Sequence, residues 1–271
     1  MIDFHSPSFW TLLLPSTLLL GSLTACGNGS QQPEPEPETM THHSDSNIHK
    51  TYQVTRLTEP VVIDSEWDKA PWNEIEPLHI EHHMGDDPEH RPGVQAKVAY
   101  DEDAIYVIYR VEDQYVRCAY TDYQDPVFRD STVEFFFTPS SNLDNGYFNL
   151  EMNCIGTALF HFQRGQGENR ERARLSHDHF DQVTIAHSLD PEEVATEMEE
   201  PVTWTMEYRI PFDILEEYSQ IDRPAPGVKW RANFYKCADD TSHPHWLTWS
   251  VIERDRPNFH VPEYFGTLVF D

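Results

Sequence analysis

The chain has 271 residues, enough for one large domain or two small ones, and 13% of them are aromatic. Its 47 acidic residues against 19 basic ones give a formal net charge of -28 at pH 7. Nucleic acids and anionic lipids would repel this charge, so the composition argues against both as partners and favours neutral or cationic ligands, or a divalent metal.

Residues 1–50 are typical of an exported protein that a lipid holds at a membrane. We predict a signal peptide at 1–25, because its apolar run contains Pro15 and is shorter than the roughly 20 residues of a membrane span. The run Leu23-Thr24-Ala25-Cys26 resembles the bacterial lipobox and predicts lipid attachment at Cys26. No Lys or Arg lies in residues 1–10, so a cleaved secretory signal without lipidation is the alternative.

A tether is predicted at 26–50, because the Pro-Glu repeats at 33–38 favour an extended chain. It would hold a domain at 51–271 away from the membrane. We therefore expect the protein in the cell envelope, exported and lipid-anchored, on the periplasmic side or at the cell surface.

From residue 51 onward, short apolar segments alternate with turn residues. Strands are predicted at 94–100, 104–111, 157–163, 183–189, 202–210, 229–238 and 265–270, a two-stranded hairpin within 128–156, and a short helix at 212–218. The stretches 164–181 and 191–201 are polar and are predicted to be loops. Many strands and few helices indicate an all-β fold, an antiparallel, jelly-roll-like β-sandwich with a few short helices.

The hairpin carries polar side chains on one face, because successive residues of a strand point to opposite sides of the sheet. In its second strand the apolar positions are Phe148, Leu150, Met152 and Cys154, which leaves Asn149, Glu151 and Asn153 on the other face. In its first strand Val133, Phe135 and Phe137 alternate with Thr132, Glu134 and Phe136. The hairpin thus presents Glu134 with Glu151 and the two asparagines on a polar surface flanked by aromatic residues.

Three cysteines follow the predicted lipidation site, namely Cys118, Cys154 and Cys237. An odd number cannot all pair within one chain. Cys154 lies among the apolar positions of its strand, so a buried thiol is the preferred interpretation. A bridge between Cys154 and Cys237 stays open in an oxidising compartment.

The domain resembles the family 9 carbohydrate-binding modules, especially the stand-alone bacterial type. The motifs that carry the resemblance include Ala99-Tyr100-Asp101-Glu102, Asp130-Ser131-Thr132-Val133-Glu134, Tyr147-Phe148-Asn149-Leu150-Glu151, Ile210-Pro211-Phe212 and Glu263-Tyr264-Phe265-Gly266. They cover nearly everything from residue 52 to the C-terminus in the expected order. The resemblance implies a non-catalytic domain that binds a saccharide or polysaccharide and supports polysaccharide capture or catabolism.

The resemblance also implies a site in which two aromatic side chains hold the sugar, and the matching positions are Phe128 and Phe259. The polar positions that hold hydroxyl groups in the family fall on Glu134, Glu151, Asn153 and Asn233, and Arg231 is added from this chain. Aromatic rings pack on the apolar face of a sugar, while carboxylates and carboxamides bind its hydroxyl groups. The alternative is a solvated sheet face in which Arg231 pairs with a glutamate.

Two other function classes stay open. A glycoside hydrolase could use Glu134 with Glu151 or Glu207, because two carboxyl groups about 5 to 9.5 Å apart suffice for that chemistry. A structural envelope lipoprotein is the interpretation that is left if the chain neither binds nor cleaves sugars.

Metal binding is a further possibility. Structural calcium could be held by loop carboxylates at Asp64, Asp101 or Asp103, since calcium prefers oxygen ligands and related modules bind it. The histidine pairs at 177 and 179 and at 243 and 245 could bind a transition metal, although such spacings arise by chance among 15 histidines.

Overall fold

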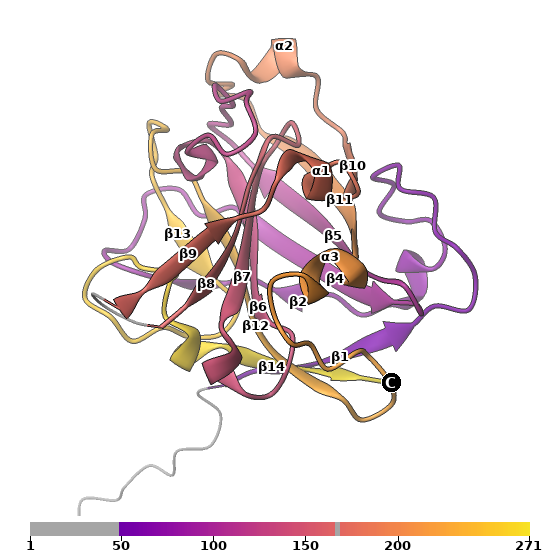
Figure 1. Cartoon of the computed structure of the whole chain (residues 1–271). Coiled ribbons are helices and arrows are strands. Elements are labelled where there is room, and N and C mark those ends of the chain that lie inside the picture. The colour runs from indigo at the N-terminus through magenta and orange to yellow at the C-terminus, as the bar shows by residue number, and fades with distance from the viewer. Residues whose placement is uncertain (1–48, 166–168) are drawn as a thin grey trace, which may run out of the picture. The chain divides into compact units, whose positions relative to one another are not determined.

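The computed structural model describes residues 49–165 and 169–271 (Figure 1). The predicted signal peptide at 1–25, the predicted lipidation site Cys26 and most of the tether predicted at 26–50 lie outside these residues. Among the residues described, no helix is long and apolar enough to cross a membrane.

Short strands account for most of the regular structure. They are β1 (Thr51–Arg56), β2 (Leu78–His79), β3 (His82–His83), β4 (Gly93–Tyr100), β5 (Ala104–Asp113), β6 (Thr132–Thr138), β7 (Tyr147–Asn153), β8 (Ala158–Arg164), β9 (Glu171–Arg174), β10 (Thr184–His187), β11 (Val202–Pro211), β12 (Lys229–Cys237), β13 (Trp246–Thr248) and β14 (Gly266–Phe270). The α-helices are α1 (His177–Phe180), α2 (Pro191–Val194) and α3 (Phe212–Glu216). Single 3-10 turns include η1 (Trp72–Glu74), η2 (Val127–Arg129), η3 (Leu143–Asn145) and η5 (Pro262–Tyr264).

The strands of the described chain form one curled sheet of fourteen strands, whose main path runs β10-β11-β5-β4-β1-β14-β12-β6-β7-β8-β9. β1 pairs in parallel with β4 and with β14, and so connects two halves whose other pairings are antiparallel. The half with β4, β5 and β11 faces the half with β6, β7 and β12 (Figure 1). A sheet curled in this way encloses its core as a sandwich does.

The core lies between the two halves and follows from the period-two alternation of their strands. Trp204 of β11 and Phe135 of β6 are fully buried. The ring of Tyr109 in β5 lies 6.3 Å from that of Phe234 in β12, and the Tyr109 hydroxyl donates a hydrogen bond to the backbone oxygen of Glu134, at 2.8 Å. The predicted all-β, sandwich-like fold with a few short helices is confirmed, although the parallel pairings of β1 make the sheet mixed.

The stretches predicted as loops contain more regular structure than expected. β9 and α1 lie within 164–181, and α2 lies within 191–201. β9 is exposed along its whole length, so it lacks the apolar alternation from which strands are predicted. It forms a strand because its backbone pairs with β8.

The cysteine pairing differs from both interpretations of the sequence. Cys154 forms a disulfide with Cys118, and Cys237 is a free, buried thiol. Ser131 brings the two cysteines together, because its backbone nitrogen donates to the oxygen of Arg117 and its backbone oxygen accepts from the nitrogen of Cys154. The alternation of the sequence predicted that Cys154 is buried. It could not predict that Cys118, 36 residues away in the chain, lies next to it.

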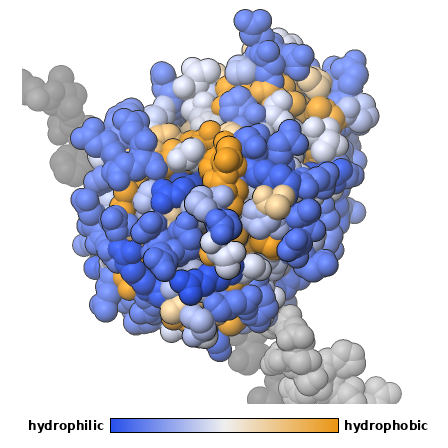
Figure 2. Space-filling model, turned by 90° about the vertical axis from the view of Figure 1, so that its right-hand side faces the viewer, coloured by the Kyte–Doolittle hydropathy of each residue, from blue (hydrophilic) through white to orange (hydrophobic). Residues whose placement is uncertain are grey.

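The molecular face seen in Figure 2 is largely hydrophilic, with small hydrophobic areas. Val62, on the loop after β1, is a large hydrophobic residue that is 72% exposed. The largest fully buried side chains are all Trp, Tyr or Phe. Most aromatic side chains therefore pack in the core. Aromatic side chains that border a cavity are the exceptions and are candidates for ligand contact.

Candidate functional site

The pairing of β12, β6, β7, β8 and β9 arranges polar side chains in rows across one face of the sheet. Directly opposite residues of antiparallel strands share a face, so their side chains are neighbours. One row contains Tyr235, Glu134, Glu151 and Leu159, the next contains Asn233, Phe136, Asn149, His161 and Arg174, and a third contains Tyr147, Gln163 and Arg172. This face points away from the main core, because the intervening residues of each strand fill that core.

A cavity of about 280 Å³ lies over the middle of these rows. Its floor consists of Glu134, Phe136, Asn149, Glu151, His161 and Gln163, and its walls include Phe128, Arg172, Cys237, Asp239, Trp246 and residues 257–260. Small-ligand sites in proteins typically measure about 300 to 1,000 Å³ and combine apolar walls with a few polar groups. The cavity has this character and is near the small end of the range.

Three aromatic side chains form the walls. Phe259 is stacked on Tyr235, with ring centroids 4.0 Å apart, and the Tyr235 hydroxyl donates a hydrogen bond to the backbone oxygen of Phe259, at 3.2 Å. The half-buried Trp246 is oriented by a hydrogen bond of 2.7 Å from its indole nitrogen to Asp239 Oδ1. Phe128, on η2, is also half-buried. The predicted pair Phe128 and Phe259 therefore borders one cavity, and contact with a ligand stays a prediction for both.

Two carboxyl groups, of Glu134 and Glu151, lie side by side on the floor, as predicted from strand alternation. Glu134 accepts a hydrogen bond from the thiol of Cys237, at 3.1 Å, and Glu151 accepts one from Asn149 Nδ2, at 2.8 Å. Burial raises the pKa of Glu151 to about 7, and burial together with the charge of Glu151 raises the pKa of Glu134 well above its usual range. The pair can therefore both donate and accept hydrogen bonds near neutral pH.

Two histidines border the same cavity and are held neutral. Burial, followed by the charge of Arg172, lowers the pKa of His161 to about 4. Burial and the charge of Arg170 lower the pKa of His260 to about 3. His260 Nδ1 lies 3.0 Å from the hydroxyl of Tyr147, whereas His161 Nε2 is buried without a hydrogen-bond partner among the described residues.

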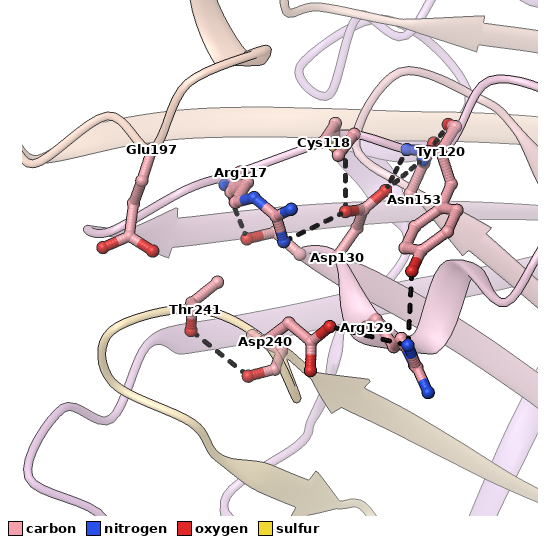
Figure 3. Close-up of polar contacts among 12 residues, drawn as sticks. Arg117, Cys118, Tyr120, Arg129, Asp130, Asn153, Glu197, Asp240 and Thr241 are labelled. Atoms are coloured by element: carbon pink, nitrogen blue, oxygen red, sulfur yellow. Dashed lines mark hydrogen bonds and ion pairs between the residues drawn. The ribbon is translucent and has the colours of Figure 1, made fainter.

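Asn153 was predicted to bind ligand, but its side chain does not line the cavity. It contacts Asp130 and Tyr120 instead (Figure 3). Its Nδ2 donates to Asp130 Oδ2 and to the backbone oxygen of Tyr120, both at 2.9 Å. Asp130 also accepts hydrogen bonds from the backbone nitrogens of Ala119 and Tyr120. Asn153 is on the predicted face of β7, but segment 117–120 covers the end of that strand.

Asn233 and Arg231 also lie outside the cavity lining. Asn233 Nδ2 donates to Thr248 Oγ1, at 3.0 Å, and its Oδ1 accepts from the backbone nitrogen of Ser250, at 2.8 Å. Arg231 donates to the backbone oxygens of Phe265 and Gly266 and forms no glutamate pair among the described residues. The hydrogen bonds of these two side chains hold residues 248–250 and 265–266 against β12. These segments cover that end of the face, so neither side chain reaches the cavity.

Glu207, the alternative partner of Glu134, occupies a different place on β11. Its carboxylate accepts hydrogen bonds from the backbone nitrogens of Asp64 and Ser65, at 2.9 and 2.8 Å, and from Trp72 Nε1, at 2.8 Å. It does not line the cavity. Of the two carboxyl pairs considered for hydrolysis, the structure brings together Glu134 and Glu151.

Two of the three loop acids considered for calcium, Asp64 and Asp101, are engaged in local contacts. Asp64 pairs with Lys69, and Asp101 Oδ1 accepts hydrogen bonds from the backbone nitrogens of Asp103 and Ala104, both at 2.8 Å. Within residues 49–165 and 169–271, no three His, Cys, Asp or Glu side chains are grouped so as to hold a metal ion. Structural calcium stays a prediction.

Several lining residues had no place among the predicted ligand contacts. Phe136 and Asn149 could have been included, because alternation places them on the same face as Glu134 and Glu151. Trp246 had a weaker signal, since it precedes the loop that carries Phe259. His161 and Arg172 depend on the pairing of β8 with β7 and β9, which the sequence did not indicate.

Comparison with known proteins identifies the domain. The family model described as carbohydrate-binding family 9 matches residues 62–270. A candidate carbohydrate-binding protein from Bacteroides uniformis has a similar structure, with a TM-score of 0.69 and 28% identity over 82% of this chain and 100% of that one. None of the curated proteins matches the chain.

Two further similar structures are of a family 9 carbohydrate-binding module from Caldicellulosiruptor kristjanssonii. The complex with glucose has a TM-score of 0.54 and 15% identity over 82% of this chain and 96% of that one. The complex with cellotriose has a TM-score of 0.51 and 16% identity over 82% of this chain and 93% of that one. At these identities the likeness concerns the fold alone.

Proposed function

Because the chain belongs to carbohydrate-binding family 9, we propose that it binds a saccharide in the cavity over β6, β7 and β8, and that it does not cleave it. The observation that carries the proposal is the combination of a polar floor with aromatic walls in one cavity of about 280 Å³. A sugar ring has the complementary surface, with apolar C–H faces and hydroxyl groups at its edge. The module from Caldicellulosiruptor kristjanssonii was solved with glucose and with cellotriose, so glucose-based sugars are the first ligands to test.

In this proposal Phe128, Trp246 and Phe259 pack against the C–H faces of the sugar. Phe259 is stacked on Tyr235, which fixes its ring at the border of the cavity. Glu134, Glu151, Asn149, Gln163 and His161 then face the hydroxyl groups. Their raised pKa values keep the two carboxyl groups partly protonated near neutral pH, so the pair can match a hydroxyl group as donor or as acceptor.

Binding without cleavage agrees with the family, whose description is that of a binding module. Hydrolysis should still be tested, because Glu134 and Glu151 are directly opposite each other in the β6–β7 ladder. Such residues have Cβ atoms about 5 Å apart, so their carboxyl groups can approach the spacing that glycoside hydrolases use. If the chain released products from a polysaccharide panel, and Glu134→Gln abolished this release, the protein would be a glycoside hydrolase instead.

A glycan array on the full-length chain, followed by calorimetry with glucose and cellotriose, tests the binding. Trp246→Ala is expected to weaken binding by about tenfold, because it removes an aromatic wall. Trp67→Ala is the matched control, since Trp67 is also a half-buried tryptophan but packs in a separate cluster around Trp72. An array without any bound glycan, or equal losses in both variants, would contradict the proposal.

We also propose that the protein is exported and lipid-anchored at Cys26, and that it supports polysaccharide capture or catabolism at the cell envelope. The support is the lipobox-like run before Cys26 and the Pro-Glu repeats that follow. Cys26→Ser should move the protein from the membrane fraction to the soluble fraction. Equal fractionation of both proteins would contradict the anchor and would leave the sugar-binding proposal standing.

A further inference from the structure

Three arginines, Arg170, Arg172 and Arg174, lie in or directly before β9, the strand at one end of the sheet, and Arg172 lines the cavity. This is a high local density of positive charge in a chain with 19 basic and 47 acidic residues. In the β8–β9 ladder Arg172 is opposite Gln163 and Arg174 is opposite His161. Because opposite residues share a face, both guanidinium groups are on the face that carries the cavity.

Within the part of the chain that the structure describes, no carboxylate pairs with these arginines, which is unusual in an acidic protein. Among the described residues none of the three forms an ion pair, and the one side-chain contact is from Arg170 Nε to Gln163 Oε1. Glu171 does not neutralise them across the strand, because it is opposite Arg164 and so belongs to the other face of the sheet. Arg223, by contrast, pairs with both Asp213 and Glu216.

A second observation points to a ligand at the same place. His161 lies in the row between Asn149 and Arg174, lines the cavity and is 3% exposed. Its Nε2 has no hydrogen-bond partner among residues 49–165 and 169–271. A buried polar atom without a partner is costly, and a bound ligand can supply the missing hydrogen bond.

We propose that the cavity and β9 together bind an acidic saccharide, one that carries a carboxylate or a sulfate ester. The inference rests on the proposed sugar-binding function and names the class of sugar. The ring lies over the floor, His161 Nε2 contacts the ring substituent beside it, and the acidic group lies at Arg172 and Arg174. Guanidinium groups bind carboxylate and sulfate oxygens through charge-assisted, often paired, hydrogen bonds.

The acidic floor does not oppose this arrangement below neutral pH. Burial raises the pKa of Glu151 to about 7 and raises the pKa of Asp239 as well. Burial and the charge of Glu151 raise the pKa of Glu134 well above its usual range. Glu134 and Glu151 are therefore largely protonated at pH 6, where a uronate and a sulfate ester are both ionised. The arginines then dominate the local charge, although the net charge of the chain is negative.

Calorimetry on the full-length chain at pH 6 and low salt tests the proposal with four probes: glucose, glucuronate, glucose 6-sulfate and glucosamine. We expect glucuronate, glucose 6-sulfate or both to bind about tenfold more tightly than glucose, and the two acids separate a carboxylate site from a sulfate site. The preference should shrink in about 1 M salt, where the Debye length is about 3 Å. If none of the four monosaccharides binds detectably, the same comparison is made between the acidic and neutral glycans that the array identifies.

The variant Arg174→Gln should reduce the preference for the acidic probes while it keeps the affinity for glucose, because Arg174 is on the face that carries the cavity but does not line it. Arg164→Gln is the matched control, because Arg164 is an exposed arginine on β8 that belongs to the opposite face. If glucose binds and neither acid binds more tightly, or if glucosamine binds best, the acidic-sugar proposal is wrong and the proposed function stands. If no glycan binds at all, both proposals are wrong.

Discussion

Glu151 shows how the fold controls the protonation of the candidate site. It is 5% exposed and lies opposite Glu134 in the β6–β7 ladder, so a second negative charge would form in a poorly solvated place. Burial is the main cause of its raised pKa, and the hydrogen bond from Asn149 acts in the opposite direction. The arrangement favours neutral carboxyl groups and therefore suits a ligand rich in hydroxyl groups.

A pH-dependent stability follows from this raised pKa. Because the pKa of Glu151 is about 7 in the folded chain and about 4.3 in an unfolded one, the folded state binds more protons between these values. This contribution to stability is fully present below about pH 4 and is lost as the pH rises through 7. We expect Glu151→Gln to be more stable than wild type at pH 8, by at most about 4 kcal/mol, and no more stable at pH 4. Thermal unfolding at both pH values measures this, and an equal difference at the two pH values would contradict it.

Two asparagines of β7 separate a binding role from a structural one. Asn149 lines the cavity, whereas Asn153 is fully buried against Asp130 and the backbone of Tyr120. Asn153→Ala should lower the free energy of unfolding by about 1 to 3 kcal/mol, because it leaves Asp130 with an unmade hydrogen bond, and should leave sugar affinity unchanged. Asn149→Ala should weaken sugar binding instead. Calorimetry and urea unfolding on both variants give the comparison, and a loss of affinity in Asn153→Ala would restore its predicted ligand role.

At the scale of elements, periodicity predicted the strands that have one buried face. The alternating segments 202–210 and 229–238 correspond to β11 and β12, and the near-continuous apolar run 105–109 lies in the first half of β5. Exposed β9 could not be predicted in this way, although it carries Arg172 and Arg174, which are proposed to bind an acidic sugar. Alternation also placed Asn153 and Asn233 on the correct face of the sheet. It could not predict which segments cover the ends of that face, because this depends on contacts between residues distant in sequence.

The disulfide between Cys118 and Cys154 links the segment after β5 to the end of β7. The two cysteines are 36 residues apart, and cross-links that close loops of this size typically stabilise proteins by about 2 to 4 kcal/mol. We expect Cys118→Ala/Cys154→Ala to unfold at a lower temperature than wild type. Peptide mapping without reductant should recover the two cysteines in one linked peptide. A linked peptide of Cys154 and Cys237 would instead support the bridge considered from the sequence.

At the scale of the whole folded unit, two kinds of contact join the halves of the curled sheet. Backbone pairing through β1 and β14 joins them at one place. Side chains join them elsewhere, because Lys236 of β12 and Asp113 of β5 are both buried, with Nζ and Oδ2 3.3 Å apart. Lys236 Nζ also lies 2.8 Å from His245 Nε2, and His90 Nε2 lies 2.8 Å from Asp113 Oδ1.

This buried cluster should contribute strongly to the cohesion of the two halves. Burial alone would raise the pKa of Asp113, but Lys236 and His90 hold it well below its usual range, so the carboxylate is charged in the folded state. Lys236→Met should lower the free energy of unfolding by about 3 to 5 kcal/mol, because it leaves the Asp113 carboxylate buried without its lysine partner. The double variant Lys236→Met/Asp113→Leu should recover much of this loss, since it removes both charges. Urea unfolding of the wild type, both single variants and the double variant measures the coupling, and additive losses would show that the pair does not join the halves.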